Sequence, residues 1–403
     1  MSASRVGQFF ILAAVVAGAV WWSSSDRRAD LTAVRGYVEC DETLLHEREG
    51  AGGRAQAKAS TGSTEAQQGT SSTGVGTSPT GVAPYHGLAW QIHRSEHSVE
   101  RARRLFAELA EMGADTVLIS NAGYQEHAGS ATFRIDPDIT PSEEQWLEIF
   151  AIARANNLRV ILMPIILLSE PRGNEWRGVI NPPNWDDWFA EYRNFLLHFA
   201  RIAQKGRIEA MLVGSELIST ERYTDRWRSL IADVRKVFDG KLSYSANWDH
   251  YRVVQFWDAL DLIGMTSYYK LSAEPNPSLE SLIETWRPIK RGILRWQRRV
   301  GKPLLFTEAG WCSQEGASIE PWNYYYNQKA TEAGLEEQAN CYRAFMHVWA
   351  DVPEVGGVIW WEWDDTPGGP TDYNYTPRGK PAEQVLRDWF ANQSRPTPLP
   401  TAP

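Results

Sequence analysis

The feature that most constrains this chain is a regular alternation of short apolar segments with longer amphipathic ones. Eight runs rich in β-branched and other apolar residues have the length of strands, and helical periodicity fills most of the gaps between them. Because these runs are apolar on both faces, they are typical of the buried strands of a parallel sheet. Strands are predicted at Gly87–Ile92, Thr116–Ser120, Arg159–Leu168, Ile208–Leu217, Lys241–Asn247, Leu262–Tyr269, Pro303–Trp311 and Val355–Trp363.

Eight strand–helix units in succession predict an α/β fold, a (β/α)8 TIM barrel. A doubly wound open sheet is the alternative, but no Gly-rich phosphate-binding loop follows the first strand. The gap after Asn247 is shorter than the others, and its helix is the least clear. The best-defined helices are predicted at Val99–Met112, Glu143–Asn156, Asp187–Gln204, Leu279–Arg299 and Leu335–Ala350.

The segments that flank the predicted barrel differ from it in composition. Residues 6–22 form an apolar run in which Gln8 is the only strongly polar side chain, and this predicts a membrane anchor or a signal peptide. An uncleaved anchor is favoured because Trp21 and Trp22 resemble an interfacial aromatic pair, and either interpretation predicts an exported protein. The stretch that follows is rich in Gly, Ser, Thr and Ala, which cannot bury enough apolar surface to fold. The predicted divisions are the anchor or signal segment (1–28), a low-complexity flexible linker (29–83), the barrel (84–393) and a disordered Pro-rich tail (394–403).

Charge and composition exclude several classes of function. The 41 Lys and Arg residues against 50 Asp and Glu residues give a net charge of −9, whereas nucleic-acid binding needs clustered cations. Only His93 and His97 among the eight histidines have HxxxH spacing, and no GxSxG motif is present, so no metal and no cofactor are predicted. Cys40, Cys312 and Cys341 are too few for a disulfide framework, although export would permit a pair between the last two. The chain is expected to be a monomer that contacts a membrane through its N-terminal segment.

Polar and aromatic side chains collect at the predicted strand ends, where the active site of such a barrel lies. Several of the 19 tryptophans, such as Trp146, Trp188, Trp286 and Trp349, fall on predicted helices and are expected in the core. Those at strand ends suit a sugar, because its C–H faces stack on flat rings while its hydroxyls reach polar neighbours. The residues predicted to bind a polysaccharide or oligosaccharide substrate are Trp90, Asn121, Ser215, Asn247, Trp248, Tyr268, Tyr269, Trp360 and Trp361.

Two glutamates at strand ends are the candidate catalytic residues. Glu216 and Glu308 each follow an apolar run, where a charge is costly to bury unless it is paired or neutralised. The two-residue period of a strand places Glu216 on the face of Gly214 and Glu308 on the face of Phe306, so both are expected to point into the barrel. Glycoside hydrolysis needs such a pair, with one carboxyl group protonated and the other ionised.

Alternative explanations for these carboxylates remain open at this level. A glutamate at the end of a strand can also form a salt bridge with a barrel arginine or cap the following helix. Glu362 and Asp364 are rival carboxylates at the end of the eighth strand, because periodicity alone does not decide which face of that strand points inward.

Five segments resemble glycoside hydrolase family 113 and its relatives, and the resemblance extends from Gly87 to Phe390. The part around Glu308, with its distal Pro321–Trp322, is the most specific. The family implies a TIM barrel of a retaining clan that acts on β-1,4-mannan and manno-oligosaccharides. The segments are LVGSEL, LDLIGMTSYYKL, LLFTEAGWCS, GGVIWWEWD and TPRGKPAEQVLRDW.

The resemblance also implies roles for matching residues. Glu216 matches the acid/base and Glu308 matches the nucleophile. Tyr268, in preference to Tyr269, matches the tyrosine that hydrogen-bonds the nucleophile.

Two further matches concern the sugar itself. Either Trp360 or Trp361 resembles the platform beneath the reactive sugar. Ser215 stands where the wider clan usually has an Asn that contacts the sugar 2-hydroxyl, a departure that bears on the identity of the substrate.

The predicted function is retaining hydrolysis of a β-linked hexose polysaccharide or oligosaccharide, with β-1,4-mannan as the expected substrate. Glu308, held ionised by hydrogen bonds, is expected to attack the anomeric carbon, and Glu216, with its pKa raised by dry or anionic surroundings, to protonate the leaving oxygen. The alternative from another class is a non-catalytic carbohydrate-binding or cell-envelope barrel, which would have no need of two converging carboxylates. A cell-wall glycan hydrolase is a third candidate, because the predicted anchor would hold the barrel at a membrane.

Overall fold

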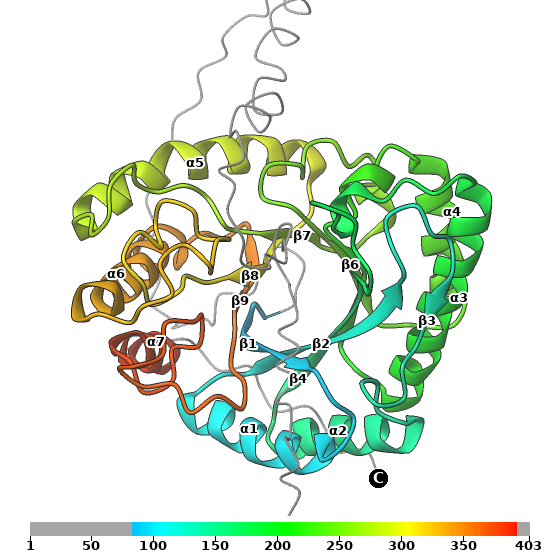
Figure 1. Cartoon of the computed structure of the whole chain (residues 1–403), viewed down its shortest axis with the longest axis horizontal. Helices are drawn as coiled ribbons and strands as arrows, with labels where there is room; N and C mark the ends of the chain where they lie inside the picture. The colour runs from blue at the N-terminus through cyan, green and yellow to red at the C-terminus, as the bar shows by residue number, and fades with distance from the viewer. Residues whose placement is uncertain (1–82, 393–403) are drawn as a thin grey trace, which may run out of the picture. The chain divides into compact units, whose positions relative to one another are not determined.

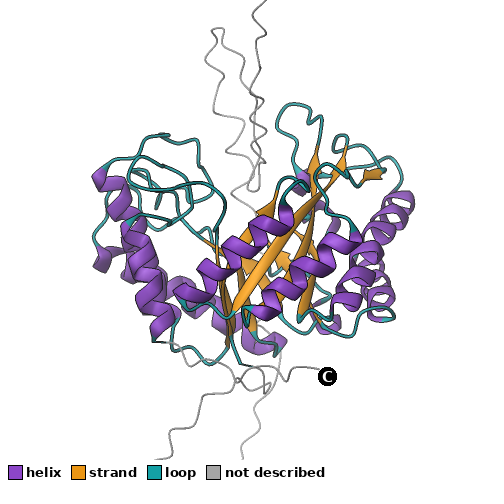
Figure 2. Cartoon of the chain, turned by 90° about the horizontal axis from the view of Figure 1, so that it is seen from below, coloured by secondary structure: helices purple, strands orange, loops and turns teal. Residues whose placement is uncertain are grey.

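Eight parallel strands close into a barrel with helices packed around its outside, which confirms the predicted TIM-barrel fold (Figures 1 and 2). The computed structural model describes residues 83–392. A short strand, β3 (Phe133–Arg134), extends the sheet as an antiparallel partner of its second strand. In order around the barrel the strands are β1 (Tyr85–Ile92), β2 (Thr116–Gln125), β4 (Arg159–Leu168), β5 (Ala210–Ser215), β6 (Lys241–Ala246), β7 (Ile263–Thr266), β8 (Leu304–Ala309) and β9 (Val355–Trp360), and β9 pairs again with β1.

The helices follow the strands in the expected alternation and form the outer ring seen in Figure 1. The helices expected from periodicity are all present, and their ends lie within a few residues of the predicted ones. The short gap after Asn247 holds only a single turn of 3-10 helix, η5 (Trp257–Ala259). The other helical elements are α1 (Ser98–Met112), α2 (Glu143–Ala155), η3 (Arg177–Val179), α3 (Trp185–Gly206), η4 (Ile218–Thr220), α4 (Thr224–Arg235), α5 (Leu279–Val300), α6 (Glu332–Trp349) and α7 (Pro381–Ala391).

Three of the predicted divisions lie mainly or wholly outside the described residues. These are the anchor or signal segment, the flexible linker and the Pro-rich tail, and they stay predictions. Within residues 83–392, no helix combines the length and the apolar character that crossing a membrane requires.

The strand ends that carry the two glutamates are irregular. The pairing register shifts between Leu212 and Ser215 on β5, and again where β8 pairs with the end of β7. A Cβ added at Gly214 would meet the rings of Tyr244 and Trp227 on the helix side, so Gly214 does not share the inward face predicted for it. The prediction that parity runs unbroken from Gly214 to Glu216 was therefore wrong, because a bulge changes which side each residue faces.

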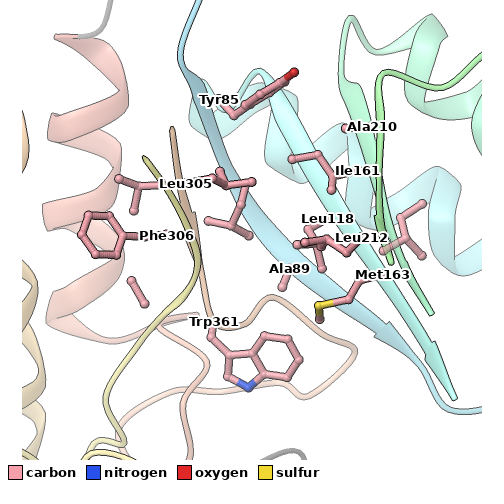
Figure 3. Close-up of a cluster of buried hydrophobic side chains, with 14 of the residues drawn as sticks. Tyr85, Ala89, Leu118, Ile161, Met163, Ala210, Leu212, Leu305, Phe306 and Trp361 are labelled. Atoms are coloured by element: carbon pink, nitrogen blue, oxygen red, sulfur yellow. The ribbon is translucent and has the colours of Figure 1, made fainter. Parts of the chain in front are cut away.

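The same correction applies to β8. The ring of Phe306 packs edge-on against Phe345 and Trp349 of α6, with centroids 5.1 and 4.8 Å away. Figure 3 shows Phe306 turned toward the helix layer, while Leu305 lies on the barrel side of the strand. Phe306 thus marks the outer face, and Glu308 reaches the inner end of the barrel because the register shifts after Phe306.

The core has two layers, one inside the barrel and one between strands and helices. Figure 3 shows part of the inner layer, in which Ala89, Leu118 and Met163 of three strands converge with Trp361, which follows β9. The outer layer is rich in aromatic residues, and the helix tryptophans predicted to be core are buried there. Each large side chain removed from water contributes about 1.5–3 kcal/mol, so this layer dominates the stabilisation of the helix ring. These tryptophans are Trp146, Trp188, Trp286 and Trp349.

Two close contacts bring the ends of β8 and β9 together beside the glutamates. The Trp361 N–H donates to the Ala309 carbonyl at 2.8 Å. A Cβ on Gly310 would lie 2.3 Å from the Trp361 carbonyl oxygen, so only glycine permits this approach.

On α6, the buried Glu337 accepts hydrogen bonds from the Gly316 and Ser318 N–H groups and so fixes the loop that follows β8.

Candidate active site

The two predicted glutamates lie at the same end of the barrel, with β6 and β7 between their strands. Glu216 comes directly after β5, and Glu308 is the penultimate residue of β8. Both are completely buried. Because neighbouring strands are parallel, their carboxyl ends meet at one end of the barrel, where TIM barrels carry their active sites. The negative charge of Glu216 raises the pKa of Glu308, so the two groups act on each other electrostatically.

Glu216 is held in a backbone conformation that residues with side chains rarely adopt. Its φ is +53°, in the left-handed region, and its N–H donates to the Ser245 carbonyl at 2.8 Å. Such conformations persist where the surroundings impose them, and they concentrate at functional sites. The side chain is bound through both oxygens: Arg177 Nη2 lies 2.6 Å from Oε2, and Thr266 Oγ1 lies 3.5 Å from Oε1.

Arg177 is the most important residue of the site that the sequence did not reveal. It opens η3, in the long loop between β4 and α3, and only 3% of its surface is exposed. Besides the ion pair with Glu216, its Nε donates to the Ser215 carbonyl at 3.2 Å. Two buried carboxylates demand a nearby cation, and that requirement is the only available signal. It does not say which of the 41 basic residues supplies the charge.

Glu308 has a different set of contacts. The Tyr268 hydroxyl donates to Glu308 Oε2 at 3.0 Å, as the family resemblance implied for Tyr268. The other oxygen, Oε1, is buried without a hydrogen-bond partner among residues 83–392. Glu308 therefore has one oxygen held by a tyrosine and one buried oxygen that no described side chain binds.

Burial controls the protonation of this pair. Removal from water raises the pKa of both glutamates, that of Glu308 to about 8. The Arg177 charge lowers the pKa of both carboxyl groups but does not cancel this effect. Desolvation and repulsion from Glu216 oppose the ionised form of Glu308, and the Tyr268 hydrogen bond favours it, so the expectation that hydrogen bonds hold Glu308 ionised stays a prediction. Of the two carboxyl groups, Glu216 is the one that contacts Arg177 directly.

Several of the predicted substrate-binding residues surround the pair. Asn247 Oδ1 lies 3.4 Å from Thr266 Oγ1, the hydroxyl that also approaches Glu216, and Asn247 is partly exposed. Ser215 precedes Glu216 and has a buried hydroxyl without a partner in the described part of the chain. These residues share the immediate surroundings of Glu216, and their binding of a substrate stays a prediction.

A second group of predicted residues lies on the adjoining loops. The Tyr269 hydroxyl donates to the Trp248 carbonyl at 2.8 Å, and the two rings meet edge-on. Trp248 also stacks on Trp322, with ring centroids 5.6 Å apart and planes 17° from parallel. All three are partly exposed, so they form an aromatic surface next to the glutamates rather than part of the core.

Three predicted substrate-binding residues are instead engaged with helices or loops, so their assignment to the substrate is wrong. Trp90 is buried and packs edge-on against Phe106 of α1, and Trp360 is buried and stacks on Tyr342 of α6 at 4.8 Å. Both tryptophans point into the helix layer, because they occupy outward positions of their strands. Asn121 is buried and ties two loops together, since its amide donates to the Ile92 and Ile139 carbonyls.

Of the two candidate platforms, only Trp361 is on the barrel side. It lies below Ala89 and near Met163 in Figure 3. The following residue, Glu362, is partly exposed, and its Oε2 is buried without a partner in the structure from residue 83 to 392. Burial and the charges of Asp364 and Glu308 raise the pKa of Glu362 well above its ordinary value. Glu362 is thus the rival carboxylate that approaches the pair.

The described residues contain neither a metal-binding cluster nor a disulfide. Among the described residues no three His, Cys, Asp or Glu side chains are grouped closely enough to hold a metal ion. Cys312 and Cys341 are both buried free thiols, so the pair that export would permit is not formed. Cys40 lies outside the described residues.

The comparisons with known proteins agree on one family. The model of Glycoside Hydrolase Family 113 matches residues 87–380. The structure of the GH113 β-mannanase AaManA from Alicyclobacillus acidocaldarius, solved in complex with ManMIm, is 28% identical, with a TM-score of 0.69 over 78% of this chain and 99% of its own. Another structure, of a GH113 β-1,4-mannanase, is 29% identical, with a TM-score of 0.68 over 77% of this chain and all of its own. No curated protein matches the chain.

A more distant likeness concerns the fold alone. A GH5_18 protein from Streptomyces cattleya, solved with Manβ1-4GlcNAc, is 14% identical and has a TM-score of 0.52 over 79% of this chain and 83% of its own.

Proposed function

The chain belongs to glycoside hydrolase family 113, and from this membership and the geometry of the site we propose that it hydrolyses β-1,4-mannan or a related β-linked hexose polymer with retention of configuration. It is a glycoside hydrolase with a carbohydrate substrate. The observation that carries the mechanism is the pair of buried glutamates, one bound by Arg177 and the other by Tyr268. The two solved GH113 β-mannanases support mannan as the substrate.

In the first proposed step, Glu308 Oε1 attacks the anomeric carbon, and the glycosidic C–O bond breaks. Glu216 gives its proton to the departing oxygen, and Glu308 becomes a neutral glycosyl ester. Oε1 is suited to the attack because no described side chain occupies it, while Tyr268 keeps the carboxylate oriented through Oε2. The buried pair holds the proton that this step consumes, since the pKa of both groups is raised.

In the second proposed step, water attacks the anomeric carbon from the side that the leaving group has vacated. Glu216 Oε takes a proton from this water, the ester C–O bond breaks, and Glu308 leaves as a carboxylate. Two inversions at one carbon give net retention. Glu216 is protonated again at the end of the cycle, so the site is ready for another substrate.

The test is hydrolysis by the purified full-length chain of β-mannan, glucomannan, cellulose, xylan and peptidoglycan, followed by release of reducing ends. The Glu308→Gln variant is measured beside it, with Glu209→Gln as the matched control, since Glu209 precedes β5 at the opposite end of the barrel. Release from mannans that is lost only in Glu308→Gln supports the proposal. Release from another polymer alone would overturn the substrate, and binding without any release would favour a carbohydrate-binding barrel.

The stereochemistry is tested separately. Proton NMR of the first sugars released shows whether the new reducing end has the β configuration, as retention requires. An initial α product would contradict double displacement and would imply that a water is activated directly.

We also propose that residues 1–28 export the barrel and tether it to a membrane. The support is the apolar run at residues 6–22 with Trp21 and Trp22 at its end. Fractionation of cells that make the full chain, followed by alkaline extraction of the membranes and protease treatment of intact spheroplasts, tests this. Recovery of the chain in the soluble cytoplasm would contradict it.

A further inference from the structure

We propose that Arg177 is a positioning residue that decides which of the two glutamates carries the shared proton, and that it favours the carboxylate form of Glu216 needed as the base of the second step. The inference rests on the proposed double displacement by Glu216 and Glu308. The loop between β4 and α3, which carries Arg177, would then control the protonation of a catalytic glutamate, although both glutamates come from β5 and β8.

The first support is the geometry of the ion pair. Arg177 Nη2 is 2.6 Å from Glu216 Oε2, and its Nε is 3.2 Å from the carbonyl of Ser215. The guanidinium therefore hydrogen-bonds both the carboxylate of Glu216 and the backbone of the preceding residue. The side chains of Arg177 and Glu216 are 2% and 1% exposed, so water screens little of their attraction.

The second support is the way the loop holds Arg177 in place. A Cβ on Gly178 would lie 2.3 Å from the indole ring of Trp176, so this ring packs directly on the backbone next to Arg177. The Val179 N–H donates to the Trp176 carbonyl, and the Asn181 N–H donates to the Ala128 carbonyl in the loop after β2. Arg177 is thus presented by a fixed turn and not by a free side chain at the surface.

The third support is the character of the other charged groups around the pair. Those facing it from the remaining strand ends and loops are acids or phenols, and His250 belongs to the same cluster through its contact with Asp249. Arg177 is the cation that acts on both Glu216 and Glu308. The facing groups are Asp249 after β6, Glu221 after η4, Tyr268 after β7, and Glu362 and Tyr375 after β9.

The charge of Arg177 has opposite consequences for the two steps. Before the first step Glu216 must hold a proton, and the ion pair opposes this. Once Glu308 has become a neutral ester, its negative charge is gone and the Arg177 charge acts on Glu216 alone. Glu216 is then held as a carboxylate, in the state that removes a proton from water. Loss of Arg177 is therefore expected to harm the second step more than the first.

The first experiment measures the proton directly and needs no substrate. Glutamate labelled with ¹³C at the carboxyl carbon is incorporated into the full chain, and the carboxyl signals of Glu216 and Glu308 are identified from Glu216→Gln and Glu308→Gln. In Arg177→Met, both midpoints are expected to move to higher pH, and Glu216, which touches Arg177, is expected to move by at least one unit, about a tenfold gain in proton affinity. Unchanged midpoints would overturn the proposal.

The second experiment separates the two chemical steps. Aryl β-manno-oligosides with good leaving groups report the second step in kcat, and those with poor leaving groups report the first. For substrates with good leaving groups, Arg177→Met is expected to lower kcat. This loss should be about tenfold or more larger than the loss for substrates with poor leaving groups. Both limbs of the pH profile of kcat/KM should move to higher pH. Equal losses on all substrates with unmoved limbs would show that Arg177 is merely structural.

Two variants serve as controls. Arg177→Lys keeps the charge but not the two-pronged contact, so it should keep the pH profile close to that of the unaltered protein. Arg159→Met removes a similarly buried arginine that pairs with Asp115 at 2.6 Å at the start of β4, away from the site, and should lower stability without moving the profile. If Arg177→Met does not fold, Arg177→Lys still tests the proposal. A pH profile of Arg177→Lys that moves to higher pH, although the charge is kept, would overturn it. If the ¹³C midpoints shift while the unaltered protein hydrolyses no glycan, the assigned control of the proton stands and the proposed function fails.

Discussion

At the scale of single residues, the site is a balance between burial and compensation. Burial raises the pKa of Glu216 and of Glu308, and the Arg177 charge lowers both; hydrogen bonds from Thr266 and Arg177 lower the pKa of Glu216, and the Tyr268 hydrogen bond lowers that of Glu308. The surroundings thus keep a proton in the site at neutral pH, which the first step of hydrolysis consumes. The cost is that two carboxyl groups are removed from water with few partners.

The two glutamates should respond differently to removal. Glu308→Ala is expected to reduce turnover by about a thousandfold or more on every substrate, because no nucleophile remains. Glu216→Ala should spare substrates whose leaving groups need no proton, and added azide should restore turnover by replacing the base-activated water. The rates are followed with aryl β-manno-oligosides, and the product of azide attack is identified by NMR. Similar mild losses in both variants would contradict the assigned roles.

Tyr268 offers a test of the environment of Glu308. Tyr268→Phe removes the hydrogen bond to Oε2, which lowers the pKa of Glu308, so that pKa should rise further. The acidic limb of kcat/KM, which reports ionisation of the nucleophile, should therefore move to higher pH, with about a tenfold loss at low pH. Tyr375→Phe is the matched control, because the Tyr375 hydroxyl donates to the Pro321 carbonyl instead. A limb that moves equally in both variants would argue against a specific role for Tyr268.

At the scale of elements, the strand ends depart from ideal geometry where the chemistry is placed. Register shifts at the ends of β5 and β8 bring Glu216 and Glu308 inward although Gly214 and Phe306 face the helices. Bulges of this kind re-aim a side chain without disturbing the rest of the strand. The barrel below the site keeps regular pairing, for example along the whole length of β4 with β2.

The contact between the ends of β8 and β9 should be sensitive to a single added carbon. Gly310→Ala would place a methyl group 2.3 Å from the Trp361 carbonyl, so it is expected to lower the free energy of unfolding by about 1–3 kcal/mol and to displace Trp361. Thermal unfolding and mannan hydrolysis report the two effects. Gly292→Ala is the control, since α5 has room there and alanine favours a helix. Equal stability of both variants would contradict this close contact.

At the scale of the whole molecule, the site makes the fold weaker at high pH. Glu308 has a pKa near 8 in the folded protein against an ordinary 4.5, so the folded state binds this proton more tightly than the unfolded chain does. The stabilisation is complete below about pH 4.5 and is lost as the pH rises toward 8. The reactive site is therefore maintained at the expense of stability in neutral and alkaline solution.

This predicts a pH-dependent gain from removing the charge. Glu308→Gln should unfold at a higher temperature than the unaltered protein at pH 8, and the difference should shrink toward pH 5, where Glu308 is already neutral. Calorimetry at both pH values checks the prediction, with Glu209→Gln as the control. A difference that is the same at pH 5 and pH 8 would show that burial of the Glu308 charge does not limit stability.

The fold class and the identity of the central acids follow from the order of residues along the chain. Apolar runs in alternation with amphipathic helices specify a parallel barrel, because both faces of each strand must be buried, and Arg159–Leu168 was predicted with the ends that it has. Glu216 and Glu308 stood out because a charge after an apolar run is costly to bury, and family resemblance picked out Tyr268 beside Glu308.

The surroundings of those acids depend on contacts between residues far apart in the chain. The direction of a side chain at a strand end depends on bulges and loop packing, which have no two-residue period. For this reason the helices and loops engage three residues predicted to bind substrate, Trp90, Asn121 and Trp360. Arg177 came from a loop far along the chain from Glu308, and no local pattern marks it. The proton balance between the two glutamates is likewise a tertiary property, since burial and neighbouring charges set each pKa.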